Sequence, residues 1–519
     1  MKQRRVKDRV PMDNEAQGTI NRRVAMHIKR RVSGWLTLAV FAVGGAMVAS
    51  DPAFAKVDVD NLTIGGEARV RYEYRTSVYF GGTTGNLSYA TDRIRVNVGY
   101  DLTPDVSFFA QIQDARAWGG EITGGAGGQA NSGIGAVSSA NQTNGSNVNG
   151  IDLHQGYIQL RNVLVPGLSV KAGRQEIIFG DHRLFGNFGW SQIGNSFDAV
   201  RLTHSMPIAD VDVFWARIAD TGNAGLVGAA GGVALTAGGN AAVFGTRNQD
   251  IYGLYVTLKP IPSWTIEPYY FLLQDTRIAS GANNALTTPQ GADQTRSTLG
   301  GRINGKAGGL DATAELAWQF GGASSGASQV HNLHINAWAG VFKAGYTFDP
   351  VPMKPRVGIE IDYASGSNCT TTCGKDHTFD NLYPTNHGQY SYMDLMAWRN
   401  MVRYMAMFDV KPDAVSKLQV NFSIDRLANH LDNWYRANQT AYATTLATNT
   451  SSSLGRELDV HYYRTIKEKF KFEIGYGHFW AGEYISNGKA GTANRSTASF
   501  GTPSGTGENW GYVMGSVLF

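Results

Sequence analysis

The stretch Gly173–Leu202, which reads GRQEIIFGDHRLFGNFGWSQIGNSFDAVRL, places six charged side chains and a histidine among aromatic and β-branched residues. It contains no heptad repeat and no helix-length apolar stripe. Charges at this density on strand-like sequence need water on one side. The simplest geometry is a pair of adjacent strands, Ser169–Phe179 and Ser196–His204, joined over a glycine-rich crossing, with one apolar face and one face toward a wet interior. A solvated face of an ordinary β-sandwich is the alternative.

The segments around this stretch alternate between polar and apolar residues. In Glu67–Tyr74 the glutamates and arginines occupy one face, and alanine, valine and tyrosines occupy the other. The same period of two recurs in 310–319, 356–363 and 418–425. The chain beyond residue 55 has no apolar window of about eighteen residues, so we expect no helical membrane span. In a sandwich the charged face would be outside, whereas in a membrane barrel lipid takes the apolar face and the lumen takes the charges.

The connections between these segments distinguish the two folds. Short connections such as Met206–Ala209 and Lys467–Lys469 alternate without a break with long ones such as Gly119–Asn149 and Gly366–Trp398. This asymmetry is typical of outer-membrane barrels, which have short periplasmic turns and long outer loops. The sequence therefore predicts an all-β fold, a transmembrane antiparallel β-barrel of about 18 strands. The last predicted strand, Trp510–Phe519, ends on an aromatic residue, as such barrels do.

The N-terminal segment 1–55 has the composition of a secretory signal peptide with a long basic n-region. The apolar run Trp35–Val48 follows that region, and the tripeptide Ala53–Ala55 has the small-x-small form of a cleavage site. We therefore expect a single barrel domain over 56–519. The leader carries ten basic and four acidic residues, so the formal charge of +4 falls to about −2 without it. The basic pI is thus no argument for nucleic-acid binding.

Two cysteines, Cys369 and Cys373, lie in a loop rich in Ser, Thr and Gly. In an oxidising compartment this spacing predicts a local disulfide. The histidines show no metal-ligand spacing, and no Walker motif occurs, so we expect no metal, no cofactor and no nucleotide site.

Three stretches resemble the alginate-export family of outer-membrane porins. They are Gly173–Leu202; Phe379–Tyr435, which contains FDNLYP, YMDLMAWRN and LDNWY; and Gly455–Tyr484, which contains GRELDVHYYRT and GYGHFWAGEY. They are spread over most of the mature chain, so the similarity extends to the whole barrel. The resemblance implies a monomeric barrel of about eighteen strands whose arginine-rich lumen passes an acidic polysaccharide.

Carried onto this sequence, the resemblance implies a conduit lined by charged residues: Arg174, Asp181, Arg183, Asp198, Arg201, Asp394, Arg399, Glu457 and Asp459. Alternation adds arginines on the polar strand faces: Arg69, Arg71, Arg93, Arg95 and Arg302. Around Gly173 the alternation slips, which leaves open whether Arg174 or Gln175 faces the lumen. The planar guanidinium stays charged and pairs with carboxylates in a forked geometry. For any single arginine, an ion pair that braces the wall is the competing interpretation.

These patterns favour a passive channel for an anionic polysaccharide or oligosaccharide such as alginate, in the outer membrane of a Gram-negative bacterium. A general or small-anion-selective porin is the alternative within the same fold. An outer-membrane or secreted β-rich enzyme acting on carbohydrate or lipid is the alternative of another class, but no G-x-S-x-G or similar signature occurs, so we expect no enzyme. The expected partners are outer-membrane lipid, an anionic polysaccharide and periplasmic export or uptake components, without nucleic acid.

Overall fold

The computed structural model describes residues 59–76, 80, 86–118, 150–220, 248–276, 294–324, 333–367, 374–435, 437, 441–488, 490–495, 498–499 and 505–519. The expected signal peptide, the expected disulfide between Cys369 and Cys373, and long connections such as Gly119–Asn149 lie outside these residues. The chain divides into Met1–Thr63 and Ile64–Phe519. In the first unit the described residues form the 3-10 turn η1 (Val59–Asn61) and the start of β1.

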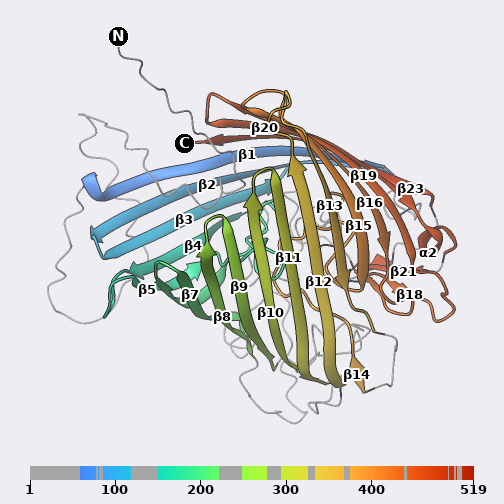
Figure 1. Cartoon of the computed structure of the whole chain (residues 1–519), viewed down its shortest axis with the longest axis horizontal. Helices are drawn as coiled ribbons and strands as arrows, with labels where there is room; N and C mark the ends of the chain where they lie inside the picture. The colour runs from blue at the N-terminus through green and yellow to red at the C-terminus, as the bar shows by residue number, and fades with distance from the viewer. Residues whose placement is uncertain are drawn as a thin grey trace, which may run out of the picture. The chain divides into compact units, whose positions relative to one another are not determined.

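In the described part of the chain, eighteen strands pair antiparallel, each with the next along the wall, and the last pairs with the first to close a barrel (Figure 1). The predicted fold class is confirmed. At the seam, Glu67–Thr76 of the first strand run antiparallel to Leu518–Asn509 of the last. The wall strands are β1 (Leu62–Thr76), β2 (Leu87–Thr103), β3 (Val106–Ala117), β4 (Gly150–Leu160), β5 (Leu168–Gln175), β6 (Phe197–Ser205), β7 (Ala209–Asp220), β8 (Asn248–Ile261), β9 (Trp264–Asp275), β10 (Gln294–Ala307), β11 (Leu310–Ala323), β12 (Leu333–Thr347), β13 (Arg356–Ala364), β15 (Met401–Val410), β16 (Ser416–Arg426), β19 (Ser453–Ile466), β20 (Phe470–Ala481) and β23 (Gly507–Leu518).

Several short elements lie in the long connections. The two-residue strand β14 (Lys375–Asp376) pairs in parallel with β12, and α2 (Glu483–Ser486) is a single helical turn. Among the described residues, no helix has both the length and the apolar character needed to cross a membrane. A separate small sheet consists of β17 (Trp434–Tyr435), β18 (Ala441–Thr445), β21 (Ala490–Arg495) and β22 (Ala498–Ser499).

The wall has an apolar outer face and a polar inner face. On β1 the side chain of Val70 is 46% exposed whereas its neighbour Arg69 is 4% exposed, and on β13 Ile359 is 51% exposed whereas Glu360 is 1% exposed. Successive residues of a strand point to opposite faces, so the charges share the lumen side. The outer residues are the ones that lipid would cover, as in other membrane barrels. The alternation predicted from the sequence is confirmed at these positions.

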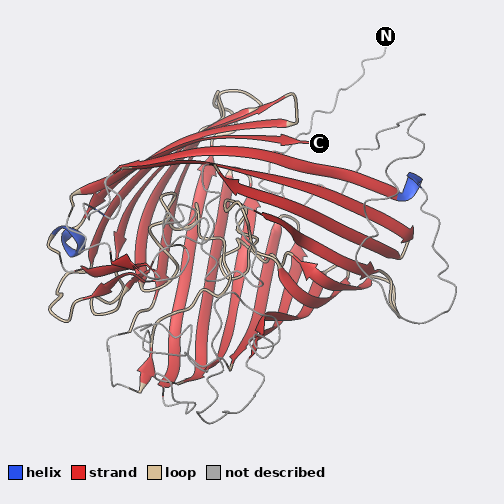
Figure 2. Ribbon diagram, turned by 180° about the vertical axis from the view of Figure 1, so that it is seen from behind, coloured by secondary structure: helices blue, strands red, loops and turns tan. Residues whose placement is uncertain are grey.

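Two long connections fold back into the lumen, where Figure 2 shows loops inside the ring of strands. We call 176–196 the first inner segment and 374–400 the second inner segment. They contact each other through a parallel bridge between Phe185 and Tyr383, with the Gly186 amide donating to the Tyr383 carbonyl at 2.9 Å. The predicted strand Ser169–Phe179 was therefore too long. β5 ends at Gln175, because the chain leaves the wall there and turns inward.

Candidate functional site

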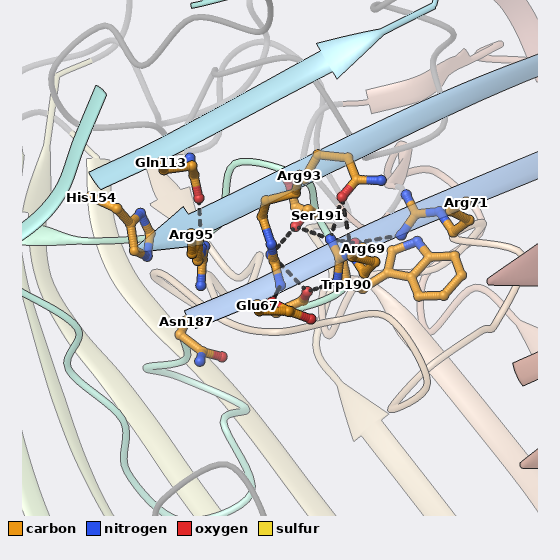
Figure 3. Close-up of polar contacts among 12 residues, drawn as sticks. Glu67, Arg69, Arg71, Arg93, Arg95, Gln113, His154, Asn187, Trp190 and Ser191 are labelled. Carbon is orange, nitrogen blue, oxygen red and sulfur yellow. Dashed lines mark hydrogen bonds and ion pairs between the residues drawn. The ribbon is translucent and has the colours of Figure 1, made fainter. Parts of the chain in front are cut away.

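Four arginines stand side by side on the inner face of β1 and β2 (Figure 3). We call Arg69, Arg71, Arg93 and Arg95 the arginine cluster. Residues two apart on a strand point to the same face, so each strand aims two guanidinium groups into the lumen. All four side chains are buried, because the first inner segment lies against them. The structure thus brings together four residues that were predicted separately from the alternation of two strands.

The arginine cluster donates hydrogen bonds to a run of backbone carbonyl groups in the first inner segment. Arg69 also donates from Nε to the side-chain Oε1 of Gln192 at 3.0 Å. The bonds to carbonyl groups are Arg69 Nη1 to Gly189 at 2.7 Å, Arg69 Nη2 to Ser191 at 2.9 Å, Arg71 Nη1 to Trp190 at 2.6 Å, Arg93 Nη1 to Ser191 at 2.9 Å and Arg95 Nη2 to Ile193 at 3.1 Å. Four guanidinium groups therefore share neutral oxygen acceptors from one short stretch of chain.

Carboxylates lie beside three members of the arginine cluster. Arg93 is paired with Glu67 at 2.6 Å, Arg71 with Glu73 at 2.8 Å, and Arg95 lies 3.6 Å from Glu176. Among the described residues, Arg69 forms no ion pair, and its acceptors are neutral oxygens. A buried cation held by neutral groups favours the approach of an anion, because carboxylates form stronger bonds to guanidinium than carbonyl groups do.

Glu176 anchors the start of the first inner segment. Its carboxylate lies 3.0 Å from His154 Nε2 and accepts a hydrogen bond from Asn187 Nδ2 at 3.1 Å. Burial alone would raise the pKa of Glu176, but the contact with His154, the charge of Arg95 and the bond from Asn187 lower it to about 2. Glu176 is therefore ionised at neutral pH and connects the barrel wall to the base of the loop that meets the arginine cluster.

The earlier part of the first inner segment is held by ion pairs. Arg183 bonds to Glu360 Oε1 at 2.5 Å and to Asp362 Oδ1 at 2.9 Å, and all three side chains are buried. Asp181 pairs with Arg302 of β10, which also holds Glu267 at 2.8 Å. The predicted residues Asp181, Arg183 and Arg302 thus meet inside the barrel, in ion pairs that fix the first inner segment to the wall.

Two further predicted residues, Asp394 and Arg399, lie within the packed second inner segment. Asp394 Oδ1 is 3.0 Å from His387 Nδ1, and the Arg399 guanidinium lies 4.5 Å from the centre of the Tyr435 ring. The nearest carboxylate that pairs with Arg399 belongs to Asp380, at 3.9 Å. Burial lowers the pKa of Arg399, but Asp380 and the groups around it raise it overall, so this side chain stays charged.

Glu457 and Asp459 occupy neighbouring inward positions on β19, where the second inner segment lies against the inner face of the wall. Glu457 accepts hydrogen bonds from the Ser391 hydroxyl at 2.7 Å and from the Tyr392 amide at 3.0 Å. Asp459 is buried beside it. Glu457 therefore fastens the second inner segment, and Asp459 lies beside it, on a part of the wall separate from the arginine cluster.

The structure separates three predicted residues that lie on neighbouring strands. Arg201 of β6 faces inward and pairs with Asp212 of β7 at 2.8 Å. Arg174 and Asp198 pair with each other at 2.9 Å on the outward face, while Gln175 points inward and is buried. The expectation that Arg174 and Asp198 line the conduit is thus corrected by the structure.

Gly173 explains why the alternation slips next to Arg174. Its φ is +126°, and a Cβ at this position would lie 2.3 Å from the Gly156 carbonyl oxygen. Only glycine adopts this backbone conformation without strain. Because glycine has no side chain, residue 173 does not indicate which face of the strand points into the lumen.

Sequence reasoning missed the residues that the inner segments contribute. The indole of Trp190 lies between Arg71, whose guanidinium carbon is 3.8 Å from the ring centre, and His387, which stacks on it at 3.9 Å. Glu360 and Asp362 stood on a predicted polar face but were not assigned to the site. Two carboxylates on one face of the strand could have indicated that Glu360 and Asp362 bind a cation inside the barrel. Backbone carbonyl acceptors cannot be recognised from a sequence.

A sequence model of the alginate export family matches residues 60–499, which is most of the chain. The chain belongs to the alginate export family. No curated protein matched the sequence. Among solved structures, this family member is similar to OccAB1 of Acinetobacter baumannii, with a TM-score of 0.51 and 11% identity over 91% of this chain and 99% of that chain.

Two porins of Pseudomonas give similar values. The BenF-like porin of Pseudomonas fluorescens Pf-5 has a TM-score of 0.50 and 10% identity over 89% of this chain and 99% of that chain. The outer membrane protein OprD of Pseudomonas aeruginosa has a TM-score of 0.50 and 9% identity over 88% and 93%. Identity this low shows the fold alone. Family and fold together support an outer-membrane channel.

Proposed function

We propose that this protein is a passive channel for an anionic polysaccharide or oligosaccharide, alginate-like in chemistry, in the outer membrane of a Gram-negative bacterium. The observation that carries the proposal is the arginine cluster, in which two adjacent strands aim four guanidinium groups into the lumen. Arg201 adds a half-buried inward cation on β6. Cations along the inner wall lower the barrier for an anion that enters a low-dielectric passage.

Inward carboxylates balance these cations. Glu67, Glu73 and Asp212 hold the side chains of Arg93, Arg71 and Arg201 in fixed orientations on the inner face of the wall. A passage that bound anions only tightly would not release them, and neighbouring acidic groups keep binding weak enough for transit. Transport would be driven by the gradient of the solute alone.

A second candidate is a channel for small anions, and one observation favours it. The first and second inner segments both cross the lumen and contact each other, which narrows the interior of the barrel. The two candidates share the selectivity mechanism and differ in the size of the solute. Single-channel current recordings distinguish the two candidates. Oligouronates should interrupt the current of a glycan channel, because they enter the pore, and should leave the current of a small-anion channel unchanged, because they are excluded.

The test compares Arg201 with Arg174 in planar lipid bilayers. Both arginines are 21% exposed and paired with carboxylates. Arg201 pairs with Asp212 and faces the lumen, whereas Arg174 pairs with Asp198 and Asp152 and faces outward. We expect the natural chain to prefer anions, R201Q to shift the reversal potential toward zero in a salt gradient, and R174Q to leave it unchanged. Equal effects of both substitutions, or a cation preference of the natural chain, would contradict the proposal.

The proposal includes the surroundings of the channel. The mature chain would begin near residue 56 after removal of its leader and would work as a monomer surrounded by outer-membrane lipid. Periplasmic export or uptake components would deliver or receive the glycan. Size-exclusion chromatography with light scattering in detergent tests the monomer, and N-terminal sequencing of the purified barrel tests the cleavage site.

A further inference from the structure

The part of the first inner segment that meets the arginine cluster is a small closed loop. The Asn195 amide donates to the Asn187 carbonyl at 2.7 Å, which joins the two ends of the intervening residues 188–194. We call Phe188–Gly194 the strap. Asn195 also bonds through Nδ2 to the Gly186 carbonyl at 3.0 Å, so the base of the loop is fastened independently of its tip.

The strap is attached to the wall chiefly through its backbone. Its carbonyl groups at Gly189, Trp190, Ser191 and Ile193 accept from the arginine cluster, and Gln192 adds a side-chain acceptor. Gly194 suits this position because its φ is +76°, and a Cβ there would lie 3.0 Å from the Asn187 carbonyl oxygen. The contacts between the strap and the arginine cluster therefore join a cation to neutral oxygens.

The residues just before the strap are attached differently. Arg183 is held by the buried carboxylates of Glu360 and Asp362, and Asp181 is held by Arg302. Separating Arg183 from its carboxylates would leave the buried charges of Arg183 and Asp362 without a paired partner, which is strongly unfavourable. The strap can leave the wall without that penalty if another acceptor takes over the guanidinium groups.

We propose that the strap is a displaceable occupant of the anion site, and that carboxylates of the transported glycan replace its carbonyl oxygens on the arginine cluster. The inference rests on the proposed function, and adds that the substrate opens its own passage. The strap would turn about Asn187 and Asn195, while the ion-paired residues before it stay in place.

Three observations support the exchange. A carboxylate forms shorter and stronger bonds to a guanidinium than a carbonyl oxygen does, and it can engage two N–H groups at once. Arg69 forms no ion pair within the described residues, so an arriving carboxylate meets a cation held by neutral groups. Phe188, the first residue of the strap, has a φ of 46°, a left-handed conformation that is strained for a residue with a side chain and can relax when the strap moves.

Trp190 reports the position of the strap. Its indole lies against Arg71 on one side and against His387 of the second inner segment on the other. Displacement of the strap would remove both contacts and bring the ring into water. Once the indole ring has left, the Arg71 guanidinium becomes accessible to the incoming anion.

The experiment measures how fast a cysteine in the strap reacts with a water-soluble thiol reagent. Ile193→Cys replaces a buried side chain of the strap and keeps the backbone carbonyl that accepts from Arg95. Leu184→Cys replaces a buried side chain in the ion-paired region as the matched control. Both are made in the full chain with Cys369→Ser and Cys373→Ser. The probe is a purified oligouronate of defined length, and the control is a neutral oligosaccharide of equal length.

We expect the oligouronate to raise the labelling rate of Ile193→Cys by about tenfold or more, as the open state grows from a minor population. Leu184→Cys should react at an unchanged rate, and the neutral oligosaccharide should have no effect. If the oligouronate blocks the current of the natural chain but leaves Ile193→Cys protected, the strap proposal is wrong and the channel proposal stands. If it neither blocks current nor changes labelling, both proposals are wrong.

Tryptophan fluorescence of the natural chain gives a second measurement that needs no cysteine. The oligouronate should change the emission, and the change should be lost in Trp190→Phe. The chain has eleven tryptophans, so the measurement is the difference between the natural chain and Trp190→Phe. An emission change of equal size in both would overturn the proposal.

Discussion

Two neighbouring regions of one loop are attached to the same barrel by different chemistry. Around Arg183 the first inner segment is held by a cation placed between two buried carboxylates, whereas the strap offers carbonyl oxygens to cations of the wall. In the first region charge is balanced by the chain itself. In the second region the wall carries cations, and the strap covers them with neutral carbonyl oxygens but supplies no negative charge. The difference separates a permanent anchor from a contact that a solute of opposite charge can replace.

The largest expected effect comes from removing the anchor. Arg183→Met leaves Asp362 buried without its paired cation and leaves Glu360 with Lys343 alone, which should lower the free energy of unfolding by about 3–5 kcal/mol. Urea unfolding in detergent micelles, followed by tryptophan fluorescence, measures the change. Adding Glu360→Gln and Asp362→Asn should restore much of the loss. A loss under about 1 kcal/mol would show that the pair behaves like a surface contact.

A smaller effect is expected at the strap. Arg69→Gln removes the donors that reach Gly189, Ser191 and Gln192, and should weaken the attachment of the strap by about 1–3 kcal/mol. The global unfolding midpoint should change little, because the anchor at Arg183 remains. Labelling of Ile193→Cys in the absence of any oligouronate should become faster. A lower unfolding midpoint with unchanged labelling would assign Arg69 to the stability of the wall instead.

Acid should loosen the strap through Glu176. The pKa of this carboxyl is about 2 in the folded chain against an ordinary value of 4.5, so its stabilising contribution is complete above pH 4.5 and is lost as pH falls toward 2. Protonation weakens the bond from Asn187, which is the hinge of the strap. Thiol labelling cannot follow this change, because the reactive thiolate is absent in acid. The part of the tryptophan emission that is lost in Trp190→Phe should therefore change as the pH falls through this range, and Glu176→Gln should flatten the change. If the pH dependence is the same in Glu176→Gln, protonation of Glu176 is not what loosens the strap in acid.

The smallest effect is expected for two half-exposed ion pairs. Arg174→Gln and Arg201→Gln should each change the free energy of unfolding by less than about 1 kcal/mol, because water and salt screen these charges. Thermal unfolding in detergent at low and high salt measures both. Since the two variants should be equally stable, any difference in their ion selectivity reports the face on which each arginine lies. A large stability loss in one of them would remove this control.

Periodicity alone predicted most of the wall. The alternation at Glu67–Tyr74 and at 356–363 was sufficient to place Val70 and Ile359 outside and Arg69 and Glu360 inside. It failed next to Gly173, where a positive φ and the approach of the Gly156 carbonyl interrupt the pattern. The pattern therefore left the face of Arg174 open. The family resemblance placed this residue in the conduit, whereas the structure buries Gln175 on the inner face and turns Arg174 outward.

The partners of the inward charges were less predictable. Arg183 was identified as a lumen residue, but its pairing with Glu360 joins positions that are 177 residues apart in the chain. Contacts at that separation depend on how a loop folds back, and no local pattern encodes them. Most acceptors of the arginine cluster are backbone carbonyl groups, which every residue has. The residue types in the sequence therefore could not show which residues would accept these hydrogen bonds.

The sequence by itself determined that this chain closes into a barrel with lipid-facing apolar residues and inward charges, because a period of two and the alternation of short and long connections are local properties. Only the tertiary structure decided what each inward charge meets. The inner segments turn some arginines into anchors and cover others with neutral oxygens, since a polar group buried inside the lumen is stabilised by whatever partners the returning chain supplies.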